Sequence, residues 1–555
     1  MTQQPPPGPS PSASPAAGKG AAPAQPVRMT VPPEVAQRYG ARVLDPGSAM
    51  RAAQGRAPAP AVYIGDRLTI RNRPGERSAS DAITELQSHA ALAGVDVSAQ
   101  PGLQLDEQLL ASLHPQVREL IERHWVQTVR LAPGADAPSL PVDAWPFLRR
   151  AREVEPDKAR GAHLDHLVAS SAAIEGTPYW VGTPYWVGTP YWVGTPYWVG
   201  TPYWVGTPAS EYGRPGFGGR SPVAVVLPDP ATDAPPVPRA PVVAIPDSGI
   251  GKHPWFPRPD DPASAATNRV DFHGIPLGLD GPAGAGYEAP QQNPLDPTIA
   301  SDAGHGTFIA GLIRQLCAQA QILAFPVMRA DGVVPESCLI NSLTLLLARH
   351  KEALVTGTTD GLLDVLSLSL GYYHENAEDA SMDGPFGALL REFGELGVAV
   401  VTAAGNATTI TPMYPAGFAN KEANLAPGRV PLASVGASNP DGETVAYFSN
   451  DGDWVTTYRP GAALVSTFPT DITSAQQPAA RVEYGGHVRS TIDPDDFRGG
   501  FCTWSGTSFA APVLAGQLAA ALAKDPDIAE PGQQAAVTRG RRAVFTTITE
   551  WTDRA

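Results

Sequence analysis

The chain has 555 residues, of which 43% are hydrophobic and 17% are charged, and its formal net charge is −15. This length accommodates about two domains with a large core, and the acidic balance argues against nucleic acid as a partner. Three cysteines are too few for a disulfide framework, and no stretch reaches the roughly 18 apolar residues that a membrane span needs.

The first part of the chain divides into a tail and a folded region. Residues 1–27 are almost all Pro, Ala, Ser, Gly and Gln, which predicts a disordered tail. The start lacks the charged end and apolar core of a secretory signal, so we expect a cytoplasmic protein or export by another route. Residues 28–175 are predicted to form an N-terminal α/β region with a hairpin or paired strands over 61–71, helices over 80–92 and 109–123, and a strand over 125–131.

Two histidines in this region, His163 and His166, have the spacing of a metal-binding pair. Nothing else near them in the sequence supports a ligand set. We therefore discount this pair and assign no residue of the chain as a metal ligand.

A hexapeptide repeat follows, in a predicted linker over 176–240. Gly-Thr-Pro-Tyr-Trp-Val occurs five times without variation over 176–205, and a sixth copy begins at Gly206. Six residues that include Gly and Pro cannot build a packed element per repeat, so an extended conformation is expected. Two interpretations stay open: a repeat that expanded within a linker, or an aromatic tether that docks on the protein's surface or is cleaved.

Residues 241–525 alternate between strands and helices. Apolar strands are expected over 242–246, 321–328, 365–370 and 398–403, with helices over 305–317, 336–351 and 385–395. This alternation predicts a three-layer α/β domain, in which helices cover both faces of a largely parallel sheet and a site collects at the carboxyl ends of the strands. Residues 470–498 are predicted to form a surface insertion and residues 526–555 a C-terminal tail.

Four polar residues in this region have settings that indicate nucleophilic catalysis. Asp247 lies in Val-Val-Ala-Ile-Pro-Asp-Ser-Gly-Ile-Gly, His305 in Gly-His-Gly-Thr-Phe-Ile-Ala-Gly and Ser508 in Ser-Gly-Thr-Ser-Phe-Ala-Ala-Pro. A serine hydroxyl needs an adjacent base, and a carboxylate can orient that base. Ser508 opens a predicted helix, whose positive end favours negative charge. Asn406, in Val-Thr-Ala-Ala-Gly-Asn-Ala, can donate its side-chain amide to an oxyanion.

The order Asp, His, Ser, with the asparagine between the last two, resembles that of the subtilisin-like serine peptidases, or subtilases. The resemblance covers about 242–523. It implies a serine endopeptidase that acts through an acyl-enzyme, with the Ser508 backbone N–H as a second oxyanion donor. Two alternatives remain: a transpeptidase or macrocyclase that passes the acyl group to an amine, and a catalytically silent binding module.

The resemblance also implies a specificity pocket. Its walls would be formed by two short segments, and its floor by a single side chain: Ser369, Leu370 and Gly371; Ala403, Ala404 and Gly405; and Met413. Small walls above a methionine floor predict a preference for medium apolar residues such as Leu or Met over Phe and Tyr.

Partners and cofactors follow from the same resemblance. Protein or peptide substrates are expected, and the region 28–175 is expected to act in cis as an inhibitor or folding aid. No nucleic acid or membrane partner is expected. No cofactor is expected either, although structural calcium stays open because no ligand loop can be matched.

Overall fold

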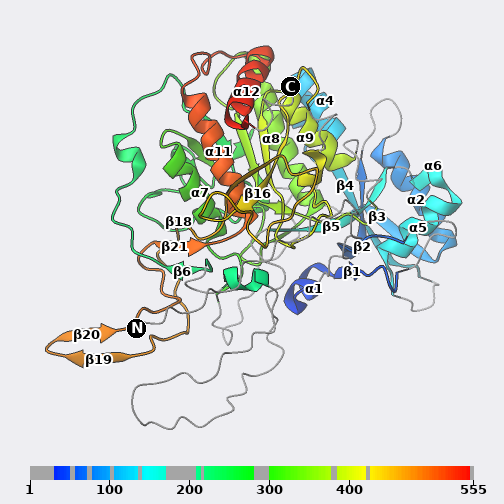
Figure 1. Ribbon diagram of the computed structural model, residues 1–555. Helices are drawn as coiled ribbons and strands as arrows, with labels where there is room; N and C mark the ends of the chain where they lie inside the picture. The colour runs from blue at the N-terminus through cyan, green and yellow to red at the C-terminus, as the bar shows by residue number, and fades with distance from the viewer. Residues whose placement is uncertain are drawn as a thin grey trace, which may run out of the picture.

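The computed structural model describes residues 31–49, 57–71, 78–99, 105–135, 141–159, 161–170, 208–213, 218–280, 299–376, 384–419 and 425–549. The expected tail over 1–27 and the hexapeptide repeats lie outside the described residues. Figure 1 shows the N-terminal elements on one side of the molecule, in blue and cyan, and the later elements on the other.

The N-terminal unit is built around an antiparallel sheet. Its long central strand β2 (Ala61–Arg71) pairs with β1 (Ala41–Leu44), β4 (Val126–Pro133) and β5 (Ala162–Ser170), and β4 pairs with β3 (Val95–Ala99). Its helices are α1 (Pro33–Tyr39), α2 (Ala79–Leu92), α3 (Glu107–Ser112), α4 (Pro115–His124), α5 (Ala144–Val154) and α6 (Pro156–Ala159).

Two element predictions in this unit need correction. The segment 61–71 is one strand of 11 residues with an irregular register between Tyr63 and Leu68, not a hairpin. The expected helix over 109–123 is broken, because Pro115 lacks an N–H and disfavours helical geometry at the residue before it. The chain therefore ends α3 at Ser112 and starts α4 at Pro115.

The second unit has the predicted three layers. Its sheet runs in the order β17 (Thr457–Pro460), β16 (Ala433–Ser438), β15 (Ala399–Ala403), β13 (Val365–Leu368), β7 (Val242–Ala244), β11 (Gln321–Leu323) and β8 (Ala266–Thr267). Every neighbouring pair in it is parallel.

Side chains alternate between the two faces of this sheet, as strand geometry requires. Val243, Val365 and Val401 belong to one core cluster with α7 (His305–Leu316) and α11 (Thr507–Ala523). Val242 and Leu366 belong to the other, with α8 (Glu336–Thr356) and α9 (Pro385–Glu395). Helix α4 of the N-terminal unit packs on α8 and α9, which joins the two units into one core.

Shorter elements complete the structure. They are β6 (Ser221–Pro222), β9 (Asp271–Phe272), β10 (Ile275–Pro276), β12 (Val333–Pro335), β14 (Leu370–Gly371), β18 (Leu464–Thr467) and β21 (Phe501–Trp504), with 3-10 turns at Pro208–Gly213, Pro230–Asp233, Gly278–Asp280 and Ala416–Ala419.

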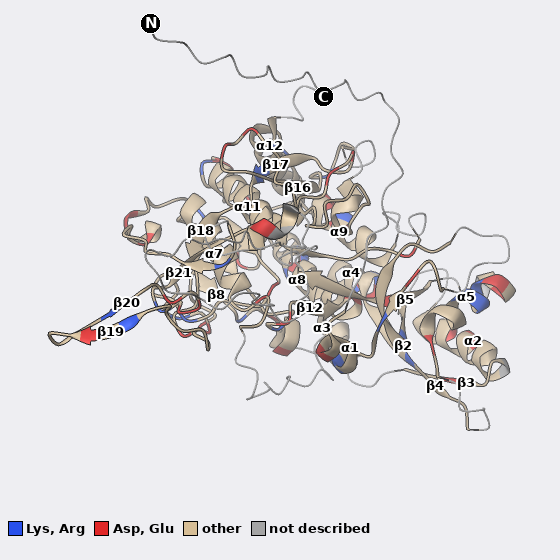
Figure 2. Ribbon diagram, turned by 60° about the horizontal axis from the view of Figure 1, so that its bottom comes forward, with Lys and Arg blue, Asp and Glu red and all other residues tan. Residues whose placement is uncertain are grey.

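The predicted surface insertion contains a projecting hairpin. Strands β19 (Arg481–Tyr484) and β20 (His487–Ser490) pair with each other and every residue in them is exposed. Gly485 and Gly486 both have positive φ, the geometry of a tight two-residue hairpin turn. Figure 2 shows this hairpin standing away from the body of the protein.

Two expected boundaries are wrong. Residues Gln533–Thr547 do not form a tail but the helix α12, whose Val544 is fully buried in the same core as α11. The linker does not run free to residue 240, because Ala209 is buried in that core and β6 pairs with β21. Apolar residues in both segments make this packing favourable.

Among the described residues, no helix is long and apolar enough to cross a membrane.

A buried carboxylate ties the ends of the second unit together. Asp364, immediately before β13, receives two hydrogen bonds from Arg239, Nη1 to Oδ2 at 2.8 Å and Nη2 to Oδ1 at 2.6 Å. Its Oδ2 also accepts from Val242 N at 2.9 Å, and Nε of Arg539 in α12 lies 3.8 Å from Oδ1. The side chains of Asp364 and Arg539 are each only 2% exposed.

We expect Asp364→Ala to lower the free energy of unfolding by about 3–5 kcal/mol, because it leaves buried guanidinium groups without their counter-charge. Urea unfolding followed by circular dichroism measures this. The control is Asp360→Ala, which removes a fully exposed carboxylate paired with Arg349 and should cost less than about 1 kcal/mol. Equal effects of the two substitutions would contradict the prediction.

Candidate active site

An aspartate and a histidine meet at the carboxyl edge of the parallel sheet. Asp247 lies three residues after β7, and His305 is the first residue of α7. His305 Nδ1 lies 2.9 Å and 3.0 Å from the two carboxylate oxygens of Asp247. Gly304 precedes the histidine with φ 81°, and a Cβ there would lie 2.5 Å from the Phe468 ring, so only glycine allows this entry into the helix.

The surroundings of His305 favour its charged form. Burial opposes the charge, but the Asp247 carboxylate and its hydrogen bond outweigh burial and raise the pKa of His305 above its usual value. The rings of Trp504 and Phe509 pack around the imidazole, with centroids 5.8 Å and 5.3 Å away. Nε2, the nitrogen opposite Asp247, is buried and makes no hydrogen bond within the described structure.

Ser508 is the second residue of α11 and is completely buried. Its Oγ donates to the carbonyl oxygen of Ser369 at 3.3 Å, and Ser369 Oγ donates to the carbonyl oxygen of Ser508 at 2.7 Å. The structure thus directs the serine hydroxyl toward Ser369 and not toward His305.

Pro512 explains why the Ser508 carbonyl accepts a hydrogen bond from the Ser369 hydroxyl. It lies in the second turn of α11, where its missing N–H leaves the carbonyl four residues earlier, that of Ser508, without a helical donor. The Ser369 hydroxyl supplies the donor instead.

Asn406 caps the same helix. Its Oδ1 accepts hydrogen bonds from the backbone N–H and the hydroxyl of Thr507, both at 2.9 Å. Thr507 Oγ1 in turn accepts from Gly405 N at 2.9 Å. Because the oxygen is held by the helix end, Nδ2 is the donor end of the Asn406 amide. The structure therefore brings Asn406 to the residue next to Ser508.

The two expected wall segments approach each other at Met413, although Leu370 and Ala403 belong to different core clusters. Ser369, Leu370, Ala403 and Ala404 are all buried. Met413 touches both expected walls, because a Cβ on Gly371 would lie 2.6 Å from its Cε and a Cβ on Gly405 would lie 2.8 Å from its Sδ.

Sequence reasoning missed three polar residues around this site. Thr507 adjoins Ser508, and its position was the available signal. Asn450 holds the turn that follows β15, because its Nδ2 donates to the carbonyl oxygen of Ala404 at 2.9 Å and its Oδ1 accepts from Ala407 N at 2.9 Å. Asp302 is buried three residues before His305 and helps to raise its pKa. No local pattern around Asn450 or Asp302 indicates these contacts.

The N-terminal unit reaches this site through β5. This strand pairs antiparallel with β12 and with β14, so that Ala169 lies opposite both Val333 and Gly371. The last residue of β5, Ser170, donates its N–H to the Gly332 carbonyl at 2.7 Å and its hydroxyl to Asp302. Since β14 directly follows Ser369, the end of β5 lies close to Ser508.

The sequence of the second unit is similar to that of known proteins. A sequence model described as the subtilase family matches residues 239–550, more than half of the chain. "Subtilisin-like protease 3" of Arthroderma benhamiae is 28% identical over 276 residues, which are 48% of this chain and 56% of that protein. "Subtilase-type proteinase psp3" of Schizosaccharomyces pombe is 27% identical over 233 residues, 41% of this chain and 40% of that protein. The chain thus spans about half the length of the curated relatives it matches.

Two solved structures are also similar to part of the chain. A cold adapted subtilisin-like serine proteinase has 18% identity and a TM-score of 0.31 over 54% of this chain and 79% of its own. A lanthipeptide protease has 20% identity and a TM-score of 0.34 over 54% of this chain and 78% of its own.

The second unit is a three-layer α/β fold with an Asp–His pair at the carboxyl edge of its parallel sheet. The chain belongs to the subtilase family.

The Asp247–His305 contact predicts a titration that can be measured. We expect the pKa of His305 to lie above its ordinary value of about 6.5 and to fall in Asp247→Asn, which removes the negative charge. A raised pKa means that this ion pair stabilises the fold fully below pH about 6.5 and that its contribution is lost as the pH rises through the folded-state pKa.

NMR of ¹³C-labelled histidines measures the pKa of His305 in the wild type and in Asp247→Asn. The His305→Gln variant identifies the signal of His305. His350 provides the internal contrast, since burial lowers its pKa to about 4. A His305 pKa below 6.5, or one that Asp247→Asn does not change, would show that the carboxylate does not control this imidazole.

Proposed function

We propose that this protein is a serine endopeptidase in which Ser508 attacks the peptide carbonyl and forms an acyl-enzyme. The observation that carries the proposal is the buried Asp247–His305 pair, which leaves the His305 Nε2 without a partner. A general base needs a lone pair on the ring nitrogen that faces the nucleophile. The matched family and its relatives, named as proteases, support the same activity.

In the proposed reaction, the Ser508 hydroxyl leaves the Ser369 carbonyl and gives its proton to His305 Nε2. The bond from Asp247 to Nδ1 stabilises the imidazolium that forms, and the proton then passes to the leaving amine. Water repeats the sequence and releases the acyl group. The long Ser508–Ser369 bond of 3.3 Å costs little to break.

Two donors would stabilise the tetrahedral oxyanion. The first is Nδ2 of Asn406, whose orientation is supported by the two bonds from Thr507 to Oδ1. The second is the backbone N–H of Ser508, which belongs to the first turn of α11 and has no acceptor within the helix. Donors of this kind stabilise the transition state by about 3–4 kcal/mol each.

A fluorophosphonate probe tests the proposed nucleophile. Wild type should be labelled, Ser508→Ala should not be, and His305→Ala should be labelled at least about 100-fold more slowly, because it loses the base. The matched control is Ser505→Ala, which changes a nearby buried serine that donates to the Gly218 carbonyl and should keep its labelling.

Labelling that survives Ser508→Ala would refute the assignment. Mass spectrometry of the products separates hydrolysis from transfer of the acyl group to an amine, and an unlabelled wild type with no product would favour a silent binding module.

We also propose that the N-terminal unit inhibits this activity in cis. An extended peptide commonly binds a protease-like cleft by adding a strand to it, and β5 already occupies the space between β12 and β14. Complete burial of Ser508 fits a cleft that is filled.

Displacing β5 should therefore release activity. Ser170→Pro removes the hydrogen bond from the Ser170 N–H to the Gly332 carbonyl and should raise the initial rate on a small peptide substrate by about 10-fold. This is the expected effect of losing a hydrogen bond of about 1 kcal/mol and of the poor fit of the proline ring in the strand. Ser170→Ala keeps the amide and should release less. Rates are measured on chains shown by mass spectrometry to be uncleaved. An unchanged rate in Ser170→Pro would assign the unit another role.

Specificity is proposed to depend on Met413. Its contacts with Gly371 and Gly405 support a place between the two pocket walls. We expect wild type to prefer Leu or Met to Phe and Tyr, and Met413→Gly to gain large aromatics by about 1–3 kcal/mol in relative kcat/KM. Profiling with a peptide library measures this, and Met328→Gly is the control, since Met328 lies in the other core cluster. An identical profile in Met413→Gly would place this side chain outside the pocket.

A further inference from the structure

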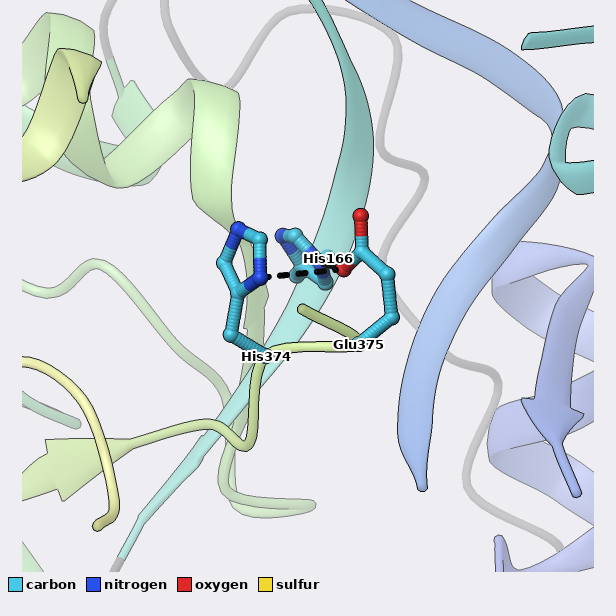
Figure 3. A group of neighbouring side chains, drawn as sticks. All are labelled: His166, His374 and Glu375. Atoms are coloured by element: carbon cyan, nitrogen blue, oxygen red, sulfur yellow. Dashed lines mark hydrogen bonds and ion pairs between the residues drawn. The ribbon is translucent and has the colours of Figure 1, made fainter. Parts of the chain in front are cut away.

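A cluster of histidine and glutamate side chains joins the two units away from the proposed catalytic residues. His166 comes from β5, whereas His374 and Glu375 follow β14. All three are buried, with exposed fractions of 1%, 8% and 3%. One ligand-type atom from each lies within 4.8 Å of the others, the only such group of His, Cys, Asp and Glu found in the described part of the chain. Figure 3 shows the three side chains converging from the two segments.

From this cluster we propose a binding site for a divalent transition-metal ion of the Zn²⁺ class, with His166, His374 and Glu375 as ligands.

The distances suit such an ion. Tetrahedral ligands with bonds of about 2.0–2.1 Å lie roughly 3.3 Å apart. The His374 Nδ1 is 3.4 Å from Glu375 Oε2, and the His166 Nε2 is 2.7 Å from the same oxygen. The first distance already fits, and the second needs a small opening. Two imidazoles and one carboxylate favour zinc over calcium or magnesium, which prefer oxygen ligands.

A second carboxylate orients the first imidazole. Glu336 Oε2 lies 2.7 Å from Nδ1 of His166, and its Oε1 accepts from the Tyr372 hydroxyl at 2.9 Å. A carboxylate on the far nitrogen of a metal-binding histidine fixes the ring and strengthens it as a ligand. With Nδ1–H donated to Glu336, Nε2 is the nitrogen that faces Glu375.

There is also space beside the cluster. His163, His166 and His374 line a cavity of about 20 Å³, together with Glu336 and Tyr372. This volume holds about one water molecule, the usual fourth ligand of an open zinc site. Burial lowers the pKa of His163 to about 3, so this ring is neutral and able to accept a hydrogen bond from that water.

Binding has two local consequences. The ion takes the position of the proton between Nε2 of His166 and Oε2 of Glu375, and that proton leaves to solvent. The ion also takes the lone pair on Nδ1 of His374. In the present structure this lone pair accepts a hydrogen bond from the backbone N–H of Asn376 at 3.0 Å, so the Asn376 amide must turn away when the ion binds.

The ion would tie β5 to the cleft, since one ligand belongs to the N-terminal unit and two to the other unit. This consequence rests on the proposed inhibition in cis, whereas metal binding does not. Both are tested on the full-length Ser508→Ala chain, so that neither result depends on peptidase activity.

The chain is stripped with a chelator and titrated with Co²⁺ and Zn²⁺. We expect one equivalent of Co²⁺ with the intense visible absorption of four-coordinate cobalt, displaced by Zn²⁺ and not by excess Ca²⁺. His374→Ala and Glu375→Gln should each weaken binding at least about 100-fold, and Glu336→Gln about 10- to 100-fold. His273→Ala, which removes an exposed histidine paired with Glu352, should bind as the parent does.

Circular dichroism checks the fold of each variant. If a variant fails to fold, the titration of the Ser508→Ala parent still decides whether the chain binds the metal. Absence of stoichiometric binding by the parent, displacement by Ca²⁺, or binding unaffected by changes to the ligands of a folded variant would overturn the site and leave a buried ion-pair cluster. Hydrogen exchange of the β5 amides should slow when Zn²⁺ is bound. Binding without slower exchange would overturn the tie between the units.

Discussion

The antiparallel pairing of β5 with β12 and β14 is the interaction on which the arrangement of the two units depends. It makes one continuous sheet from the N-terminal strands and the two short strands β12 and β14 of the second unit. Side chains on β5 add to this backbone contact. Asp165 accepts hydrogen bonds from the backbone and hydroxyl of Ser337 at the start of α8, where Pro335 offers no side-chain cap. The N-terminal unit thus satisfies backbone groups that α8 leaves open.

The parallel sheet was predictable because its strands are apolar on both faces. Runs such as 398–403 have no polar side, which is the pattern of a strand covered by helices on both faces. The local sequence therefore suffices to identify them. The motif residues were predictable for a related reason: Asp247 and His305 each stand beside a glycine or at the end of a strand, where a short sequence fixes the backbone. The structure brings these two within hydrogen-bonding distance, from positions 58 residues apart.

Contacts between distant segments were not predictable. Asp302 resembles any aspartate in a polar loop until Ser170 is brought against it. His166 has no local signal as a ligand beyond its spacing from His163, because His374 and Glu375 lie about 200 residues further along the chain. The segment that forms α12 has the sequence pattern of a tail, because its buried face has only a few apolar residues among arginines, one of which, Arg539, is itself buried near Asp364. Tertiary pairing of charges decided these positions, and no local pattern encodes it.

The reciprocal hydrogen bonds between Ser369 and Ser508 have a mechanical consequence. Pro512 leaves the carbonyl of Ser508 without a helical donor and the Ser369 hydroxyl supplies one, so the helix that carries the serine is anchored to the residue just before β14. Leu370, the first residue of β14, directly follows Ser369 and lies opposite Ser170 of β5, so the strand pairing and the serine anchor are one peptide bond apart. Turning the Ser508 hydroxyl toward His305 therefore requires breaking its bond to the Ser369 carbonyl while β5 still holds the residue that follows Ser369.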